Sequence, residues 1–470
     1  MKSTKFLVAG LLLLGATQLK AQTQTPSANS ALEGTTETGY GLQNGAVFNL
    51  ESETRNAVFF GYQAGRATNT KGTHGDNNSF LGHQAGLVNT TGASNVFVGA
   101  LAGFRNISGS QNIFVGANAG DANTSGSRNI FIGQDAGGAN TVASFNTFTG
   151  WNSGFMNTGS NNTFYGYSSG RANTSSANNA FFGANSGILS NSADNAFFGA
   201  NAGAKNSTGT SNNFFGSSAG VDNTVGSYNI FVGTFAGFKN QNGNSNVYVG
   251  HGAGFSVVSG GGNTMVGHGS GGNAIGGSNT FIGHAAGGNA TGSSNVFIGY
   301  NSGVDATGDN KLYISNSNTP TPMIYGDFTN SKVGIGGVNS FPTTAGTVNV
   351  SAYKLFVKGG ILTEEVRVNL ATQWADYVFA DKYKLASLPE VEKFIDANGH
   401  LPNVPSAKQV KEEGIELGQM ANIQQEKIEE LTLYVIQQNK QLEAQNKQLE
   451  AQQKQIDELN ASVKALMNKQ

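Results

Sequence analysis

The 470-residue chain contains no cysteine, and only 12% of its residues are charged. The lack of cysteine excludes disulfides, thiolate metal sites, a cysteine nucleophile and a lipid anchor attached to cysteine. The 27 basic and 29 acidic residues nearly cancel. The chain therefore has no strong electrostatic field that would attract nucleic acid or an anionic membrane, and we expect no nucleic-acid partner.

Long apolar runs are also missing, apart from one near the N-terminus. Residues 6–16 are apolar, follow Lys2 and Lys5, and precede a polar stretch that ends at Ala21. This pattern is typical of a signal peptide over 1–21 and predicts export to the cell surface or the medium. A buried N-terminal helix is the alternative. We expect no transmembrane segment in the mature chain. Residues 22–54, polar and without periodicity, are expected to be a linker.

Glycine is abundant, with 67 residues, and much of it belongs to one repeated unit, NxF(V/I)GxxAG. The unit occurs 15 times between residues 55 and 305, almost always 16 or 17 residues apart. Its central position is Phe in 13 copies, with Tyr248 and Met265 in the other two. Because side chains alternate along a strand, this position is expected to face a constant interior. The expected core includes Phe97, Phe114, Phe131, Phe148, Phe281 and Phe297.

The short period and the glycine content together predict the fold of this repeat region. The period is too short for pairs of helices, and each glycine would cost a helix about 1 kcal/mol relative to alanine. We therefore expect an all-β solenoid, a β-roll or β-helix of about 15 coils over 55–305, with one or two strands per coil. Stacked coils would bury the Phe row that a single coil leaves exposed. The first Asn of each unit, as in Asn95, suits a turn and could bond to the neighbouring coil. Ala102 and Gly103 predict a tight corner.

Three further segments follow the repeats. Residues 306–370 are expected to form a small neck of β-structure, with strand-like runs at 311–314, 323–328, 332–336 and 353–359. Residues 371–418 are expected to form a small α+β module. One of its helices would begin at Ser387, with Glu390 completing a capping box, and end at Gly399. Another would run from Ser406 to Gly414.

The last segment, 419–470, is expected to be an α-helical coiled coil. Apolar residues recur there in heptad positions a and d. The predicted oligomerisation residues are Ile428, Leu431, Val435, Leu442, Leu449, Ile456, Leu459, Val463 and Leu466. Gln438, Gln445 and Gln452 occupy the intervening d positions and could fix register or strand number. A single amphipathic helix packed on its own neck is the alternative interpretation.

Catalytic signatures in the sequence are weak. The motifs GYSSG at 166–170 and GSSAG at 216–220 fit the GxSxG pattern, but both are copies of the repeat. Only seven acidic residues occur between 55 and 309, too few for a calcium ladder. We expect neither enzymatic activity nor a cofactor, with a β-helical polysaccharide-processing enzyme as the less favoured alternative.

Three histidines share one position in consecutive coils. His251, His268 and His284 each follow the first glycine of a unit and would stack about 5 Å apart. Two interpretations are open: packing at the surface or in an interface, or a transition-metal site.

The unit NxF(V/I)GxxAG resembles the head repeat of YadA-like trimeric autotransporter adhesins, whose coils form a left-handed β-roll in a trimer. The stretch from Trp374 to about Tyr434 resembles the C-terminal module of secreted Bacteroidetes surface and tail-fibre-like proteins. These resemblances imply a homotrimeric adhesin or structural fibre that contacts a host or environmental surface, glycans included. A glycan- or ice-binding solenoid is the alternative, with a ligand face formed by turn residues such as Asn89, Asn123, Asn173 and Asn223.

Overall fold

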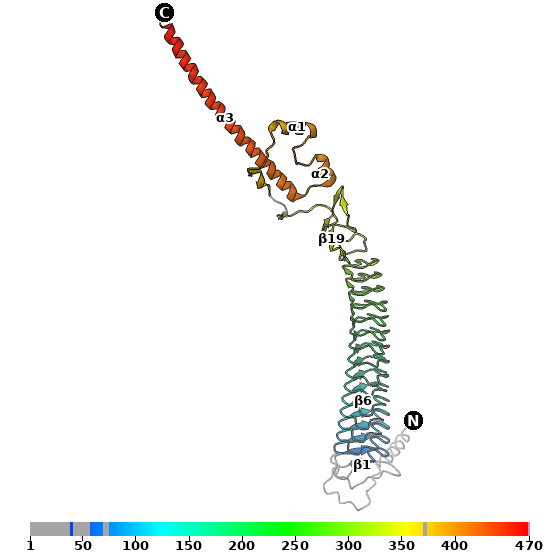
Figure 1. Ribbon diagram of the computed structural model, residues 1–470. Coiled ribbons are helices and arrows are strands. Elements are labelled where there is room, and N and C mark those ends of the chain that lie inside the picture. The colour runs from blue at the N-terminus through cyan, green and yellow to red at the C-terminus, as the bar shows by residue number, and fades with distance from the viewer. Residues whose placement is uncertain (1–37, 41–56, 69–74, 370–373, 469–470) are drawn as a thin grey trace, which may run out of the picture. The chain divides into compact units, whose positions relative to one another are not determined.

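The computed structural model describes residues 38–40, 57–68, 75–369 and 374–468 (Figure 1). Its contacts divide the chain into two units. The first comprises the chain up to Asn310 together with Ser315–Asn318, and the second comprises Lys311–Ile314 and Thr319–Gln470. The expected signal peptide, 1–21, lies outside the described residues, as does most of the expected linker.

The first unit is a β-solenoid of about 15 turns, which confirms the predicted fold. Each copy of the repeat contributes one three-residue strand, and strands β2 to β16 stack in parallel in chain order (Figure 1). The register aligns equivalent residues of neighbouring coils, so that Phe97 lies opposite Phe114. The strands are β2 Val58–Phe60, β3 Ser79–Leu81, β4 Val96–Val98, β5 Ile113–Val115, β6 Ile130–Ile132, β7 Thr147–Thr149, β8 Thr163–Tyr165, β9 Ala180–Phe182, β10 Ala196–Phe198, β11 Asn213–Phe215, β12 Ile230–Val232, β13 Val247–Val249, β14 Thr264–Val266, β15 Thr280–Ile282 and β16 Val296–Ile298.

One further strand precedes the repeats. Residues Thr38–Tyr40 form β1, which pairs in parallel with β2 and places Thr38 opposite Val58. These three residues lie in the segment expected to be a linker, so that expectation was wrong for them. The physical reason is the exposed edge of the first coil, whose free N–H and C=O groups gain partners from an added strand.

The phenylalanines expected to form the core are fully buried. Their rings stack on one another through the solenoid, with a centroid separation of 4.9 Å and an interplanar angle of 7° between Phe97 and Phe114. Tyr248 continues the stack at 4.8 Å from Phe231, and Met265 replaces the ring in the next coil. A single coil could not enclose such a ring, so the core exists only because the coils stack.

Each unit requires glycine at two positions, and the physical reason differs between them. Gly99 has φ 137°, and a Cβ there would collide with the carbonyl oxygen of Gly116 in the next coil. Gly103 has φ 58°, and a Cβ there would meet the ring of Phe97. Both positions combine a backbone conformation unfavourable for other residues with no room for a side chain, which confirms the predicted tight corner.

The first Asn of each unit forms a buried hydrogen-bonded column. The backbone N–H of Asn95 donates to Oδ1 of Asn78 at 2.9 Å, and Nδ2 of Asn95 donates to the carbonyl of Gly109 at 2.8 Å. Oδ1 of Asn95 accepts in turn from the N–H of Asn112. The predicted bonding between coils is therefore present. These side chains are also fully buried, which a turn residue alone would not require.

A second column of asparagines runs beside the turns. Nδ2 of Asn106 donates to Oδ1 of Asn89 at 2.7 Å, and Nδ2 of Asn123 donates to Oδ1 of Asn106 at 2.7 Å. Several of these amides also close their own turns, as Nδ2 of Asn89 does on the carbonyl of Gly92 and Nδ2 of Asn106 on that of Gly109. The two columns give most of these buried polar groups partners, as burial demands; the second column is interrupted at Asn140, whose side-chain amide has no hydrogen-bond partner among the described residues.

The second unit begins with a small sheet, as predicted for the β neck. Strands β17 Lys311–Ile314, β18 Ile324–Asp327 and β19 Lys332–Ile335 pair in antiparallel order. Strand β22 Leu355–Val357 pairs in parallel with β19. Strands β20 Thr344–Ala345 and β21 Val348–Asn349 form a separate short hairpin. All four predicted strand-like runs are strands.

The described part of the expected α+β module, 374–418, contains helical elements and no strand. These are the 3₁₀ helix η1 Ala375–Phe379 and the helices α1 Leu388–Asn398 and α2 Ala407–Glu413. The α+β expectation is wrong there, because the aromatic run at its start forms a 3₁₀ turn that contacts α3. Both predicted capping boxes are present, at Ser387 and Ser406, and Gly399 ends α1 at φ 75°.

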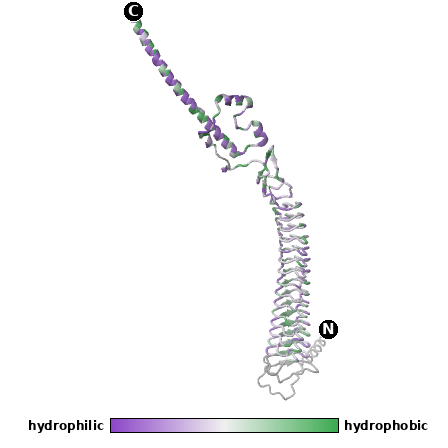
Figure 2. Cartoon of the chain, viewed as in Figure 1, coloured by the Kyte–Doolittle hydropathy of each residue, from purple (hydrophilic) through white to green (hydrophobic). Residues whose placement is uncertain are grey.

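The chain ends in one long helix, α3 Leu417–Met467, which confirms the predicted C-terminal helix. Its first part packs against η1, and the hydroxyl of Tyr434 donates to the carbonyl of Ala386 at 2.6 Å. Hydrophobic and hydrophilic residues alternate along it (Figure 2). Among the described residues, no helix has the length and apolar character needed to cross a membrane.

Replacing one ring of the core should destabilise its own coil and the two neighbouring coils. We expect Phe131→Ala to cost about 3–5 kcal/mol, the usual cost of removing a buried ring. Ile132→Ala, at a residue of the same strand that is 39% exposed, is the matched control and should cost about 0.5 kcal/mol. Hydrogen exchange measured by mass spectrometry should show faster exchange in β5, β6 and β7 for the first variant only. Equal exchange in the two variants would contradict the role of the ring stack.

Removing one asparagine of the first column should leave a buried N–H group without a partner. In Asn112→Ala, the N–H of Asn129 loses its acceptor, and the carbonyl of Gly126 loses one of its two donors but keeps Nδ2 of Asn123. The unsatisfied N–H costs about 1–3 kcal/mol, so the urea midpoint measured by circular dichroism should fall. Asn242→Ala, the same change at an exposed asparagine, is the control and should leave the midpoint unchanged. A similar fall in both variants would show that the column contributes nothing specific.

Candidate functional site

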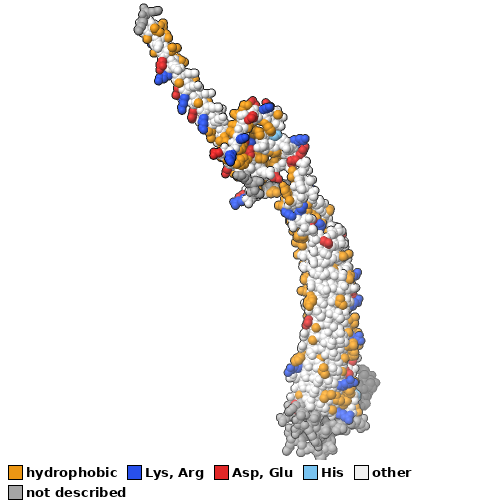
Figure 3. All heavy atoms as spheres, viewed as in Figure 1, with side chains coloured by type: hydrophobic (Ala, Val, Ile, Leu, Met, Phe, Trp, Pro, Cys, Tyr) orange, Lys and Arg blue, Asp and Glu red, His pale blue; other side chains and the backbone are white. Residues whose placement is uncertain are grey.

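The outer surface of the solenoid has few charges and a column of four aromatic rings, exposed at its two ends and half-buried at its two middle positions. Tyr165, Phe182, Phe198 and Phe215 occupy the position after the core ring in four consecutive coils. Centroids are 4.7 Å apart between Phe182 and Phe198, and 4.8 Å apart between Phe198 and Phe215. Tyr165 is 58% exposed and Phe215 41%. Figure 3 shows hydrophobic atoms over the solenoid surface with few charged groups between them. Because stacked rings cover one another's faces, this column presents mainly ring edges to solvent.

The three histidines stack as expected, and their geometry decides between the two interpretations. Ring centroids of His251 and His268 are 5.0 Å apart, as are those of His268 and His284, and each pair is within 8° of parallel. The nitrogen lone pairs of an imidazole lie in its ring plane, so parallel stacked rings cannot direct them at one ion. No group of three or more metal-ligating side chains was found among the described residues. The surface-packing interpretation fits this geometry, and the metal-site interpretation does not.

The turn asparagines cannot form the ligand face considered for a glycan- or ice-binding solenoid. Asn89, Asn123, Asn173 and Asn223 are fully buried. All four amides bond to the equivalent asparagines of adjacent coils, and those of Asn89, Asn123 and Asn223 also bond to their own turns. That expectation was wrong, because a repeated polar residue can satisfy the neighbouring coils rather than face solvent.

The two GxSxG motifs lie at corners of coils. Ser168 and Ser218 have φ 51° and 54° and donate their backbone N–H groups to Trp151 and Ala200 of the preceding coils. Each lies in a turn after a three-residue strand, with another coil following it. A nucleophile elbow needs a strand that leads into a helix, and neither motif has this arrangement.

Helix α3 carries an exposed apolar stripe. The nine predicted oligomerisation residues, from Ile428 to Leu466, are all between 47% and 68% exposed. Within the described residues of one chain, these side chains are therefore not packed on the neck, which was the alternative interpretation for this segment. The heptad spacing places them on one side of a 51-residue helix.

The start of α3 holds a buried polar cluster that the sequence did not reveal. Glu426 accepts from the Tyr377 hydroxyl, from Nδ2 of Asn403 at 3.2 Å, and from Nζ of Lys427 at 2.8 Å. Lys427 also pairs with Glu430 at 2.8 Å, and Glu430 accepts from the Tyr383 hydroxyl. From the sequence, these glutamates look like solvent-facing positions of a coiled coil. The tyrosines of the preceding module were the only signal that something covers them.

The cluster shifts the pKa values of its members. Burial disfavours the charged form of Glu426, but hydrogen bonds from Lys427, Tyr377 and Asn403 outweigh it, so its pKa lies below the ordinary value. The bond to Glu426, with burial, raises the pKa of Tyr377 to about 12. The ionised carboxylate and the protonated phenol therefore both persist at neutral pH and hold η1 on α3.

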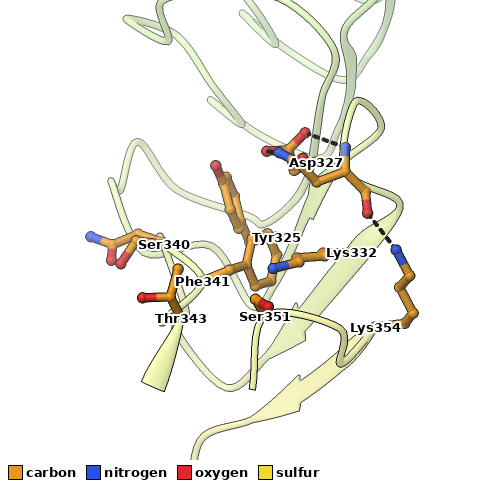
Figure 4. A pocket seen from close by; sticks show the side chains of 10 residues that line it. Tyr325, Asp327, Lys332, Ser340, Phe341, Thr343, Ser351 and Lys354 are labelled. Atoms are coloured by element: carbon orange, nitrogen blue, oxygen red, sulfur yellow. Dashed lines mark hydrogen bonds between the residues drawn. The ribbon is translucent and has the colours of Figure 1, made fainter. Parts of the chain in front are cut away.

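The second unit also contains an open pocket of about 540 Å³, shown in Figure 4. Its lining residues come from β18, the turn after it, β19 and the segment 339–354. They are Tyr325, Asp327, Asn330, Lys332, Asn339, Ser340, Phe341, Thr343, Ser351 and Lys354. In Figure 4 the side chain of Lys332 extends among the aromatic rings, and Lys354 reaches a backbone carbonyl from the side. None of these residues was identified from the sequence, because only the pairing of β19 with β22 brings the two lysines together.

No family model matches the chain, and no curated protein matches it.

The cluster at the start of α3 should make the second unit sensitive to acid. A group whose pKa is lowered by folding stabilises the fold above its unfolded pKa, here about 4.5, and this contribution is lost as the pH falls through the folded value. We expect the packing of η1 on α3 to weaken below pH about 4.5. Tyr377→Phe removes a bond to Glu426 and should reduce this pH dependence. Hydrogen exchange of residues 375–379 and 417–430 between pH 7 and 3 tests it, and equal pH dependence in both proteins would contradict it.

Proposed function

We propose that this chain is an exported fibrous surface protein that assembles through α3 as a homotrimer and works as an adhesin or structural fibre. The observation that carries the proposal is the exposed apolar stripe of α3. Its residues are exposed in a single chain, and burying each one fully would contribute about 1.5–3 kcal/mol. A second and third copy of the same helix is the partner that a heptad pattern fits.

The residues of the stripe bear on the number of helices. Both ends have Ile or Val at a and Leu at d, a combination that favours two strands, whereas the middle has Leu442 and Leu449 at a. Gln438, Gln445 and Gln452 would form polar layers that cost stability and fix the register. We propose three helices because the repeat resembles that of trimeric adhesin heads.

The solenoid supports a role in contact rather than in chemistry. It offers a long, regular and weakly charged surface with an exposed aromatic column, and its buried interior is filled by phenylalanine and asparagine. Such a surface suits adhesion to a host or environmental surface, or lateral packing in a fibre. Export through the segment 1–21 is part of the proposal.

Charge placed in the stripe should abolish assembly. We expect sedimentation equilibrium of the mature chain, 22–470, to give a trimer, and the double variant Leu449→Glu/Ile456→Glu to give a monomer. The control, Ala444→Glu/Ala451→Glu, adds the same charge at heptad position c, outside the a and d positions, and should remain a trimer. A monomeric wild-type protein would overturn the proposal, and a dimer would correct the copy number.

A further inference from the structure

The pocket in the second unit has the size and composition of a small-molecule site. Its volume, about 540 Å³, lies within the usual range for ligand pockets, about 300–1,000 Å³. Ser340, Thr343 and Ser351 provide hydroxyl groups, and Asn330 and Asn339 provide amides. Hydroxyls and amides can both donate and accept hydrogen bonds, which suits a ligand rich in hydroxyl groups.

Two lysines line this pocket without an acidic partner. Strands β19 and β22 are parallel, and Val333 lies opposite Leu355. Lys332 and Lys354, each one residue earlier, are therefore neighbours across the two strands. Nζ of Lys354 donates to the carbonyl of Asn330 at 2.9 Å, and Nζ of Lys332 lies 5.5 Å from the ring centroid of Phe356. Neither ammonium has a carboxylate within 4.0 Å among the described residues. Like charges on neighbouring strands destabilise a sheet, and a bound anion would relieve this repulsion.

Asp327, the one acidic residue among those lining the pocket, already has hydrogen-bond and ionic partners. Asp327 accepts from the N–H of Asn330 at 3.2 Å and from its Nδ2 at 3.0 Å, and lies 3.9 Å from Nζ of Lys311. Although burial raises the pKa of Asp327, these bonds and this charge outweigh it, so the net shift is downward. Asp327 is therefore balanced by Lys311, and the charge of Lys332 and Lys354 is left for a ligand.

Aromatic rings form one wall of the pocket and fix one lysine. Tyr325 and Phe341 form this wall, with ring centroids 5.2 Å apart, and Phe356, which does not line the pocket, lies 5.1 Å from Phe341. The ammonium of Lys332 lies 5.8 Å from the Phe341 centroid, within range of a cation–π interaction. This contact orients Lys332 without neutralising its charge.

We propose that this pocket binds an acidic saccharide, a sugar unit that carries a carboxylate or a sulfate. Lys332 and Lys354 bind the anionic group, the hydroxyls and amides bind the sugar hydroxyls, and the aromatic wall contacts the apolar face of the sugar ring. A bare inorganic anion would use the lysines but leave the remaining polar lining unused. The inference deepens the proposed function, since it names a ligand for an adhesin, and several copies in an assembly would add avidity.

Ligand binding to the full mature chain tests the proposal. The probes are methyl glucuronide, the methyl glycoside of N-acetylneuraminic acid and N-acetylglucosamine 6-sulfate, with methyl glucoside as the neutral sugar and sodium sulfate as the bare anion. Titrations followed by saturation-transfer NMR should show binding of at least one acidic sugar, at least tenfold tighter than binding of methyl glucoside or sulfate. Affinity should fall as salt is raised.

Substitutions then locate the site. Lys354→Gln and Lys332→Met should each weaken binding of the acidic sugar at least tenfold. Lys354→Arg should retain most of the wild-type affinity because it keeps the positive charge. Lys358→Gln, at an exposed lysine that does not line the pocket, is the matched control and should bind like the wild type. Circular dichroism checks that every variant is folded.

Three results would overturn the proposal: no acidic sugar binds, sulfate alone binds as tightly as the sugars, or Lys354→Gln and Lys358→Gln behave alike. Sedimentation equilibrium of the same samples keeps the two proposals separate. A trimer that binds no acidic sugar leaves the assembly proposal intact, and a monomer that binds it leaves the pocket proposal intact.

Discussion

Parallel, in-register stacking of one coil on the next is the interaction on which the solenoid depends. Strands stack about 4.8 Å apart, which is also close to the separation of two stacked aromatic rings. A phenylalanine repeated at the same place in every coil therefore forms a continuous column, with 4.8 Å between Phe114 and Phe131. The close stacking also accounts for the glycine at Gly99, where a Cβ would collide with the next coil, and the ring column accounts for Gly103, where a Cβ would meet Phe97 of the same coil.

Asparagine side chains provide hydrogen-bond partners for the backbone groups that the stacked coils bury. A coil with only three residues in a strand leaves most of its backbone in turns, whose buried N–H and C=O groups need partners. The amide of Asn95 supplies both a donor and an acceptor, and the repeat brings Asn78 and Asn112 to the right places above and below it. The in-register stacking of coils therefore aligns the asparagine columns and the phenylalanine column in the same way, and both hold the solenoid together.

The second unit follows a different logic, because its sequence does not repeat. Its small sheet brings Lys332 and Lys354 together by pairing strands that are distant in the sequence, and its helix α3 buries glutamates at one end while exposing apolar residues along the rest. The charge of the two pocket lysines is the basis for the proposed ligand, and the exposed apolar surface of α3 is the basis for the proposed assembly through further copies of the helix.

The repeat of 16 or 17 residues determined the fold of the solenoid, its Phe core and its tight corners, because a fixed period makes every local preference favour the same stacked arrangement. The heptad spacing of apolar residues separately determined the C-terminal helix. Tertiary structure decided side-chain burial, ring orientation and the contacts between non-repeating segments, which the periodicity of the sequence does not predict. It buried the turn asparagines that the alternative interpretation, a glycan- or ice-binding solenoid, placed on a ligand face, since solvent exposure depends on the neighbouring coils. It set the histidine rings parallel, which no spacing reveals. It also added β1, covered Glu426 with Tyr377, and paired β19 with β22 so that Lys332 and Lys354, 22 residues apart in the sequence, line one pocket. Contacts between non-repeating segments depend on register and packing rather than on local sequence.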